Sequence, residues 1–175
     1  MNETINTLIN RRSCKKYTSQ MVSEEDINLV IKAGEYAPNG KGAQSAIIIA
    51  ITNKELRDKL ANLNREIAGM KEGIDPFYNA PVVLVVLAKK SIGTHVYDGS
   101  LVIGNMLNAA ASLGLGSCWI HRAKEEFESP LGQEILRGLG ISEEYEGIGH
   151  CILGYPDGNT KEASPRKEDF VYYIK

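Results

Sequence analysis

Apolar residues recur every three or four positions in several stretches of the chain, which is the pattern of amphipathic helices. Ser23 and the three acids behind it form an N-cap with a negative first turn, and residues 37–40 (Ala-Pro-Asn-Gly) stop that helix. A longer stretch rich in Ala, Leu, Met and Val predicts a central helix that ends at Gly114. The expected helices cover residues 4–10, 23–36, 54–70, 96–113 and 134–139.

Short apolar runs between these helices predict strands. Residues 82–88 (VVLVVLA) contain no polar position, so we expect this strand to be covered on both faces. Residues 46–52 (AIIIAIT) predict a second buried strand, and brief strands are expected at 118–120 and 148–153. A last strand at residues 171–174 (VYYI) is isolated behind a polar stretch, so we expect it to complete the sheet of a partner subunit.

Strands and helices are intermixed without a regular βαβ alternation, which favours the α+β class. We expect a small, mainly antiparallel central sheet flanked by helices. No repeat, low-complexity tract or linker divides the chain, so residues 1–175 are expected to form a single domain. The long apolar helix offers more apolar surface than one small domain buries, which predicts a homodimer.

The composition argues against several classes of partner. Twenty Lys and Arg against 22 Asp and Glu give a net charge of −2, so nothing indicates binding to nucleic acid or to a membrane surface. No stretch approaches the ~20 apolar residues of a membrane span, and the N-terminus lacks the apolar core of a signal peptide. Three cysteines without a CxxC pair argue against a disulfide framework, so we expect a cytoplasmic protein.

The common nucleotide-binding motifs are incomplete. Residues 114–116 and 147–149 begin like GxGxxG, but Trp119 and Ile152 stand where the third glycine is required. The Gly40-Lys41 pair lacks the upstream glycine of a P-loop. Neither nucleotide-binding fold is therefore expected.

Cysteine and histidine spacing does not favour a metal site or a thiol nucleophile. Cys118 and His121 lie three residues apart on an expected strand, and His150 and Cys151 are adjacent, so each pair points to opposite sides. Cys14 has an electropositive neighbourhood but no nucleophile motif. We predict buried or inert thiols and no metal.

Residues 11–17 read RRSCKKY, which places four cations in seven positions of an acidic chain. One interpretation is a solvated helix end, because cations are favoured near a helix C-terminus by ~0.3–1 kcal/mol each. The other is a phosphate site, because two guanidinium groups, a hydroxyl and an ammonium suit a phosphate dianion. Arg166 and Lys167 form a second basic group that could close on the same anion. Both interpretations stay open on residue chemistry alone.

Five stretches, taken together, resemble the FMN-dependent nitroreductase family in its short form. They are RRSCKKY at 11–17, APNGKGAQS at 37–45, PFYNAPVVLVV at 76–86, LGLGSCWI at 113–120 and CILGYP at 151–156. The resemblance runs from about Ile5 to the C-terminus. It implies a nitroreductase-like fold and an interlocked homodimer with one FMN at each side of the interface. It also implies that the C-terminal strand is exchanged between subunits.

The resemblance implies roles for the two basic clusters. The first cluster would hold the FMN phosphate and ribityl groups, with Lys15 directed toward the pyrimidine side of the ring, where a cation stabilises the charge that reduction adds. The second would complete the phosphate site. The implied cofactor-binding residues of these clusters are Arg11, Arg12, Ser13, Lys15, Arg166 and Lys167.

Further flavin contacts are implied on a loop and on a strip beside the ring. The loop would cover the FMN of the other subunit through Pro38, Asn39, Gly40 and Gln44. Here Ser45-Ala46 replaces the Pro-Trp that family members often carry, which changes the expected pocket. Asn64 on the third helix is matched to the ring edge. The strip beside N5 contains His121 and Arg122, where some members have Glu-Gly.

A nitroreductase-like activity needs no nucleophile, because the flavin performs the electron transfer and the protein supplies placement and charge. NADH or NADPH would reduce the flavin, and a nitroaromatic, quinone or similar small-molecule acceptor would reoxidise it in a ping-pong cycle. Lys41 is a candidate for contact with the substrate. His121 is either a candidate proton donor or a strand-end histidine bonded to backbone, and Arg122 contacts flavin, substrate or solvent.

Two rival functions follow from the same sequence. An FMN-binding redox sensor or binding protein would keep the phosphate site without steady turnover, and the altered 38–46 loop makes this conceivable. An interaction module without a ligand would leave RRSCKKY as a solvated helix end. Bound flavin separates the module from the other two, and reduction by NAD(P)H followed by reoxidation separates the enzyme from the sensor.

Overall fold

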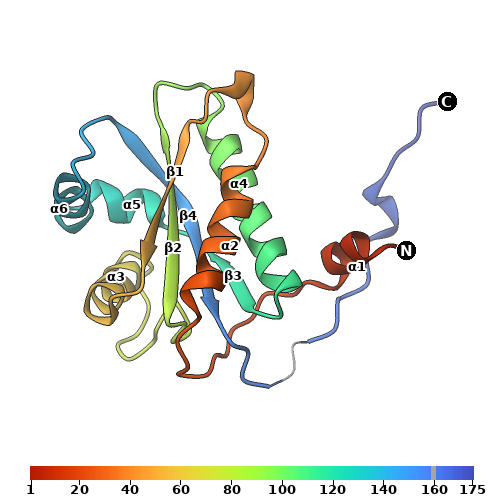
Figure 1. Ribbon diagram of the computed structural model, residues 1–175, viewed down its shortest axis with the longest axis horizontal. Helices are drawn as coiled ribbons and strands as arrows, with labels where there is room; N and C mark the ends of the chain where they lie inside the picture. The colour runs from red at the N-terminus through yellow and green to blue at the C-terminus, as the bar shows by residue number, and fades with distance from the viewer. Residues whose placement is uncertain (159–160) are drawn as a thin grey trace.

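The computed structural model describes residues 1–158 and 161–175, and a single antiparallel sheet organises this part of the chain (Figure 1). The strand order is β1-β2-β4-β3. The strands are β1 (Ala46–Ile51), β2 (Val82–Lys89), β3 (Gly116–Ile120) and β4 (Tyr145–Gly154). The helices are α1 (Glu3–Asn10), α2 (Glu24–Glu35), α3 (Lys54–Ile67), α4 (His95–Ser112), α5 (Ala123–Glu128) and α6 (Pro130–Gly138), with short 3₁₀ turns η1 (Gly40–Gly42) and η2 (Glu168–Phe170).

Strand β2 lies at the centre of the sheet, between β1 and β4, and seven of its eight residues are fully buried. Its side chains alternate between two apolar layers, as a strand requires. Val83, Val85 and Leu87 face the layer under α3, α5 and α6, whereas Val82 and Leu84 face the layer under α2 and α4. This confirms the α+β class and the prediction that this strand is covered on both faces.

The prediction of a buried strand at residues 46–52 is right about the strand and wrong about its burial. Strand β1 forms at the expected place, but it is the edge of the sheet and pairs with β2 alone among the described residues. Its first four residues are half-buried and Ala50 is exposed. A run of β-branched residues therefore reports strand formation correctly but does not distinguish a central strand from an edge strand.

Two elements between β3 and β4 were not fully anticipated. Helix α5 begins directly behind Arg122 and was not predicted, because its six residues (AKEEFE) are too short to show a period. Helix α6 begins four residues earlier than expected, at Pro130. Its start carries a recognisable signal, since the Ser129 hydroxyl accepts from the Gly132 N–H and proline occupies the first helical position.

The RRSCKKY segment lies beside β3 and the end of β4 and is joined to this region by isolated β-bridges. The Cys14 N–H donates to the Ser117 carbonyl of β3 (2.9 Å), and the Thr18 N–H donates to the Tyr155 carbonyl just beyond β4 (2.9 Å). A parallel bridge joins Ser13 to Ser117. The segment therefore has a fixed position beside β3, although α1 in front of it has no buried residue.

Several apolar side chains lie exposed outside the two core layers. Helix α1 exposes Ile5, Leu8 and Ile9. Tyr36 at the end of α2 and Tyr97 and Leu101 in the first half of α4 are also exposed. The predicted strand at residues 171–174 does not form in the single chain, where the C-terminal segment extends away from the body (Figure 1). Its pairing with a partner subunit stays a prediction. No helix in the described ranges combines the length and the apolar character needed to span a bilayer.

Helix α5 rests directly on the backbone of β4, and Gly147 makes this contact close. A β-carbon at Gly147 would lie 2.1 Å from the Ala123 carbonyl oxygen and 2.2 Å from its carbon. These are backbone atoms that begin α5 and cannot rotate away. The position of α5 on β4, and of the turn that precedes α5, therefore requires glycine at position 147.

We expect Gly147→Ala to lower the free energy of unfolding by about 2–3 kcal/mol, because the added methyl forces α5 off β4. Urea unfolding of the purified protein measures this. Gly138→Ala is the matched control, because a β-carbon there meets nothing within 4 Å and alanine is favoured in helices. Equal stability of the Gly147→Ala and Gly138→Ala variants would contradict this account of the contact.

Candidate functional site

The two arginines of RRSCKKY each keep a buried nitrogen without a partner. Arg12 Nη1 donates to the carbonyls of Ile9 (2.7 Å) and Arg11 (2.6 Å), so this guanidinium closes the C-terminus of α1, as the helix-end interpretation expects. Arg12 Nε and Arg11 Nη1, however, are buried and find no hydrogen-bond partner among the described residues. Buried polar groups are normally paired, and an unpaired charged donor is costly. These donors are suited to an anionic ligand.

Side chains from the same segment gather around β3. Burial raises the pKa of the Cys118 thiol, and the Ser13 hydroxyl with the positive charges of Lys15 and Arg11 partly offsets this effect. A hollow of about 400 Å³ opens beside them, and Arg11, Arg12, Cys14 and Gly116 lie in its wall. The hollow thus brings together the predicted Arg11 and Arg12, whereas Ser13 and Lys15 lie near the Cys118 thiol and do not line it.

The ammonium of Lys15 lies over an aromatic ring that the sequence did not single out. Its Nζ is 5.5 Å from the centre of the Tyr78 ring, within the range of a cation–π contact. Tyr78 has a positive φ of 53° and belongs to a tight turn at residues 75–80. The contact gives this flexible side chain a preferred place beside the sheet.

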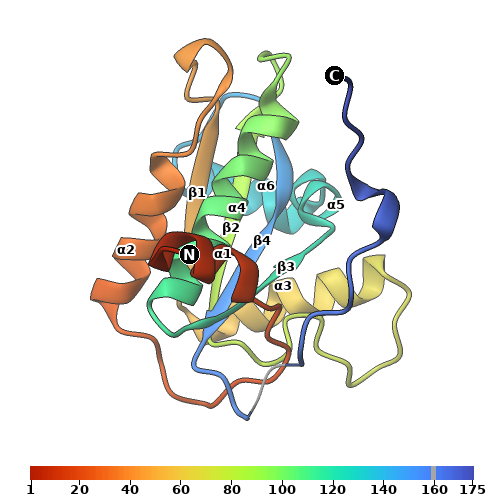
Figure 2. The ribbon, with the colours of Figure 1, turned by 90° about the vertical axis from the view of Figure 1, so that its right-hand side faces the viewer.

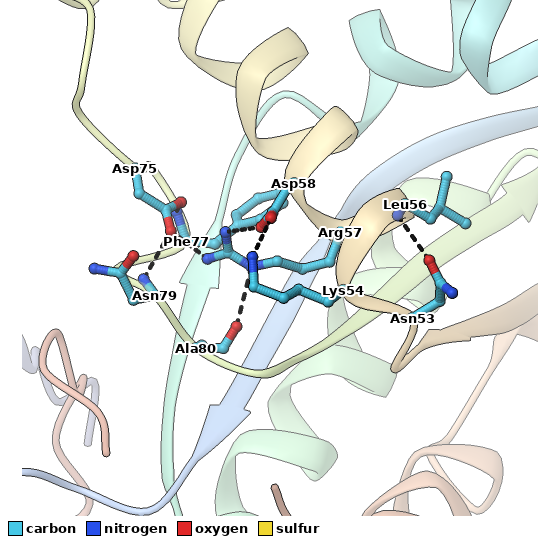
Figure 3. Close-up of polar contacts among 9 residues, drawn as sticks. All are labelled: Asn53, Lys54, Leu56, Arg57, Asp58, Asp75, Phe77, Asn79 and Ala80. Carbon is cyan, nitrogen blue, oxygen red and sulfur yellow. Dashed lines mark hydrogen bonds and ion pairs between the residues drawn. The ribbon is translucent and has the colours of Figure 1, made fainter. Parts of the chain in front are cut away.

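A buried arginine holds that turn (Figure 3). The Asp75 carboxylate accepts from the backbone N–H groups of Phe77 and Asn79, both at 2.8 Å, and pairs with the guanidinium of Arg57. Arg57 also donates through Nε to the Ala80 carbonyl (3.1 Å). The turn that presents Tyr78 to Lys15 is therefore anchored on α3.

The three cysteines are free and buried. Burial raises the pKa of both the Cys118 and the Cys151 thiols, so neither is poised as a thiolate. This confirms the prediction of buried thiols. Within residues 1–158 and 161–175, no group of three His, Cys, Asp or Glu side chains is arranged to hold a metal ion.

The loop at residues 38–45 is shaped by one buried carboxylate at the start of α4. Asp98 Oδ1 accepts from the Gly40 N–H (2.9 Å), and Oδ2 accepts from the hydroxyls of Ser45 (2.7 Å) and Thr94 (3.0 Å). Ser45 is fully buried and Asp98 is 3 % exposed. Ser45 is therefore one half of a bond that fixes the loop. Asp98 was missed because a single acid in an apolar helix carries no motif.

The remaining loop residues are held in a distorted backbone. Lys41 and Gln44 have positive φ values of 56° and 46°, and the Asn39 side chain accepts from the Gln44 N–H (2.9 Å). A cavity of about 720 Å³ adjoins the loop and is lined by Asn39, Gln44 and Asp98 among others. Lys41 is exposed, as a substrate-contacting lysine must be.

In one chain, the predicted site residues fall into separate regions. The 38–45 loop lies beyond one end of α2 and α4, and the RRSCKKY segment lies beyond the other (Figures 1 and 2). Arg166 and Lys167 lie in the exposed C-terminal segment, where Arg166 donates to the Ser164 carbonyl and Lys167 pairs with Asp169 at 3.7 Å. The single chain does not bring these regions together, so their joint contact with one ligand stays a prediction.

Asn64 connects α3 to the predicted strip, residues His121 and Arg122, which follows β3 in the sequence. Asn64 Nδ2 donates to the His121 carbonyl (2.9 Å), and its Oδ1 accepts from Arg122 Nε (2.9 Å). Asn64 Nδ2 also donates to Glu126, whose other oxygen lies 2.6 Å from His150 Nε2. Asn64, Glu126 and His150 are fully buried, whereas the side chain of His121 is exposed. The sequence located Asn64, His121 and Arg122, weighed His150 only as a metal ligand, and gave no signal for Glu126.

Acid should weaken the anchor of the 38–45 loop. Burial alone raises the pKa of Asp98, but the hydrogen bonds from Ser45, Gly40 and Thr94 outweigh it and hold the pKa below the ordinary value of 3.8. A lowered pKa in the folded protein adds stability above pH ~4 that is lost as the carboxylate takes up its proton.

We expect Asp98→Asn to lower the free energy of unfolding by about 1–2 kcal/mol at pH 7, with the difference from wild type narrowing below pH ~4. Urea unfolding at pH 7 and pH 3.5 measures both values. Glu143→Gln, which removes an exposed ion pair with Lys89, is the control and should cost less than ~0.5 kcal/mol. A pH-independent difference for Asp98→Asn would contradict the stated role of the charge.

Comparison with known proteins identifies the family. A model described as "Nitroreductase family" matches residues 8–155. FMN reductase [NAD(P)H] of Bacillus subtilis is 26% identical over 178 residues, which cover 89% of this chain and 67% of that protein. Two crystal structures match 100% of both chains at 26% identity, namely nitroreductases with bound FMN from Bacteroides fragilis (TM-score 0.88) and Desulfitobacterium hafniense (TM-score 0.89). The chain belongs to the nitroreductase family.

Proposed function

We propose that the protein is an FMN-dependent oxidoreductase that passes reducing equivalents from NAD(P)H to a small-molecule acceptor such as a nitroaromatic or a quinone. The observation that carries this proposal is the pair of buried, unpartnered nitrogens on Arg11 and Arg12 beside β3. A phosphate monoester would supply the missing acceptors, so the residues present fit FMN. Family membership and the FMN-bound relatives support the same ligand.

Each part of the site has a distinct task. Arg11, Arg12 and Ser13 would bind the phosphate and ribityl groups. Lys15, steadied over Tyr78, would place a positive charge beside the pyrimidine side of the ring. The strip with His121 and Arg122 would lie along the ring edge. Bound FMN supplies two-electron transfer between nicotinamide and acceptor, and the protein supplies placement and charge.

The raised pKa values of the Cys118 and Cys151 thiols agree with this chemistry. The buried thiols have no part in the cycle, and the protein needs no covalent intermediate with substrate. Their free state is compatible with the cytoplasmic location that we propose. His121 is exposed, so its ring is free to act as a proton donor to an acceptor, and Lys41 is free to attract an anionic substrate.

A homodimer would unite the separated parts of the site. The exposed apolar residues of α1, α4 and the C-terminal segment would be buried between two subunits. The partner's 38–45 loop, with Pro38, Asn39, Gly40 and Gln44, would then cover a ring held by this chain. Arg166 and Lys167 would complete a phosphate site in the same assembly. The exposed fractions of Tyr172 (80%), Tyr173 (81%) and Ile174 (102%) support an exchanged tail.

Spectroscopy under anaerobic conditions tests the activity. The protein reconstituted with FMN should show a bound flavin spectrum, lose its 450-nm absorbance on addition of NADH or NADPH, and regain it when menadione or a nitrofuran is added. Bound flavin that neither nicotinamide reduces would instead indicate a redox sensor or binding protein. Failure to bind any flavin would refute the proposal.

Arg11→Glu should raise the dissociation constant for FMN by at least about 100-fold, because a buried anion would replace a donor to the phosphate. Titration of the flavin-free protein by FMN fluorescence measures this. Arg137→Glu at the end of α6 makes the same change in net charge on an exposed surface and is the control. An unchanged affinity in Arg11→Glu would remove Arg11 from the phosphate site.

Deletion of residues 169–175 should shift the protein from dimer toward monomer, because it removes the apolar side chains of the proposed exchanged tail. Sedimentation velocity at several concentrations measures the shift. Serine at positions 170–174 is the matched variant, since it keeps the length of the tail and removes its apolar surface. A dimer of unchanged affinity in both variants would exclude tail exchange.

A further inference from the structure

Arg122 has a backbone conformation that side chains usually avoid. Its φ of +79° and ψ of 10° lie in the left-handed region, which favours glycine because a β-carbon is crowded there. The residue stands at the end of β3, and α5 begins on it, since the Glu126 N–H donates to the Arg122 carbonyl (3.0 Å). Something in the surrounding structure must therefore hold an arginine in this turn.

The side chain of Asn64 supplies the first restraint. Its oxygen accepts from Arg122 Nε and its amide donates to the carbonyl of His121, the residue just before the turn. Both contacts measure 2.9 Å, and Asn64 is fully buried. The side-chain amide of Asn64 on α3 thus binds two consecutive residues of the strip, His121 and Arg122.

Glu126 and His150 supply the second restraint. His150 Nδ1 lies 3.0 Å from the Ile120 carbonyl, which can only accept, so Nδ1 carries a proton. His150 Nε2 lies 2.6 Å from Glu126 Oε2, and the remaining proton is shared within this pair, either as imidazolium and carboxylate or as imidazole and carboxylic acid. Either form is neutral as a whole, which lets both groups stay fully buried.

Both restraints converge on the same three residues. The carbonyls of Ile120 and His121 and the side chain of Arg122 are each bonded to the buried group, and Glu126 links its two halves by accepting from Asn64. The phosphate-binding residues proposed above take no part in it. No contact of the group is left for solvent, so its function is internal to the fold.

We propose that Asn64, Glu126 and His150 are positioning residues that hold residues 120–122 in a strained turn, and that this turn sets the fit of the strip against FMN. Asn64 then acts through the strip and not by touching the ring itself. The proposal rests on the proposed function for its second half, whereas the first half concerns the protein alone. The two halves are separately measurable.

The first test uses the flavin-free protein and compares Arg122→Ala with Arg122→Gly. Both remove the bond to Asn64, but only glycine removes the strain. We expect hydrogen exchange of the amides at 121–123 to rise about tenfold or more in Arg122→Ala and to rise clearly less in Arg122→Gly. Equal exchange in the two variants would overturn the proposal, because the turn would then need no restraint.

The second test is a double-mutant cycle on FMN affinity. Asn64→Leu should raise the FMN dissociation constant about tenfold in the wild-type background. In the Arg122→Gly background the rise should be no more than about threefold, because glycine adopts the left-handed conformation of the turn without strain. Glu126→Gln should stay within about twofold of wild type, because glutamine can accept from Asn64 and donate to a neutral His150. Equal losses from Asn64→Leu in both backgrounds would overturn the coupling.

Val30→Ala controls for general destabilisation, since it opens the core layer under α2 on the opposite face of the sheet from Ile120 and Ala123. It should lower the melting temperature without altering exchange at 121–123 or FMN affinity. If it shifts both as strongly as Asn64→Leu does, the buried group is structural and the proposal fails. If wild-type protein binds no FMN while the exchange results hold, the proposed function fails and the positioning of the turn stands.

Discussion

The backbone pairing between residues 13–14 and β3 is the interaction on which the rest of the candidate site depends. This pairing places the RRSCKKY segment alongside β3, the strand that leads to the turn at residues 120–122. A strand rises ~3.3 Å per residue, so Ser117 and Ile120 are separated by roughly 10 Å along β3. Groups fixed at the two ends of this strand can therefore contact two distant parts of one ligand. Charge is gathered at one end and a restrained backbone turn stands at the other.

The two ends of β3 solve different physical problems. At the RRSCKKY end, buried donors on Arg11 and Arg12 are left without acceptors, a cost that a bound anion removes. At the far end, the buried group around Asn64 is fully paired, and its role is to resist the strain at Arg122. Buried donors without hydrogen-bond partners indicate a ligand site, whereas a buried polar group with all its hydrogen bonds made indicates a structural support for the backbone. Burial alone would not distinguish the unpaired donors of Arg11 and Arg12 from the fully paired group around Asn64.

The sequence predicted the elements well where apolar runs were long, as at β2 and α4, and less well where structure depends on pairing across the chain. The burial of β1 was overestimated because strand position in a sheet is a tertiary property, and α5 was missed because six residues show no period. In the site, the RRSCKKY cluster was visible as charge density. Asp98 and Glu126 were not, and His150 was weighed only as a metal ligand, because all their side-chain partners except Thr94 lie 24 or more positions away in the sequence.

The departures from the family pattern gain a physical explanation from the same contacts. Ser45 is bonded to Asp98, so a buried hydrogen bond fixes the altered 38–45 loop. Arg122 occupies a glycine-like backbone position and is bonded to Asn64. In each case a residue that departs from the pattern is paired with a buried polar partner, which indicates that the substitution and its partner work as one unit. A change to both members should therefore cost less than the sum of the two single changes, because the second change has no remaining bond to break.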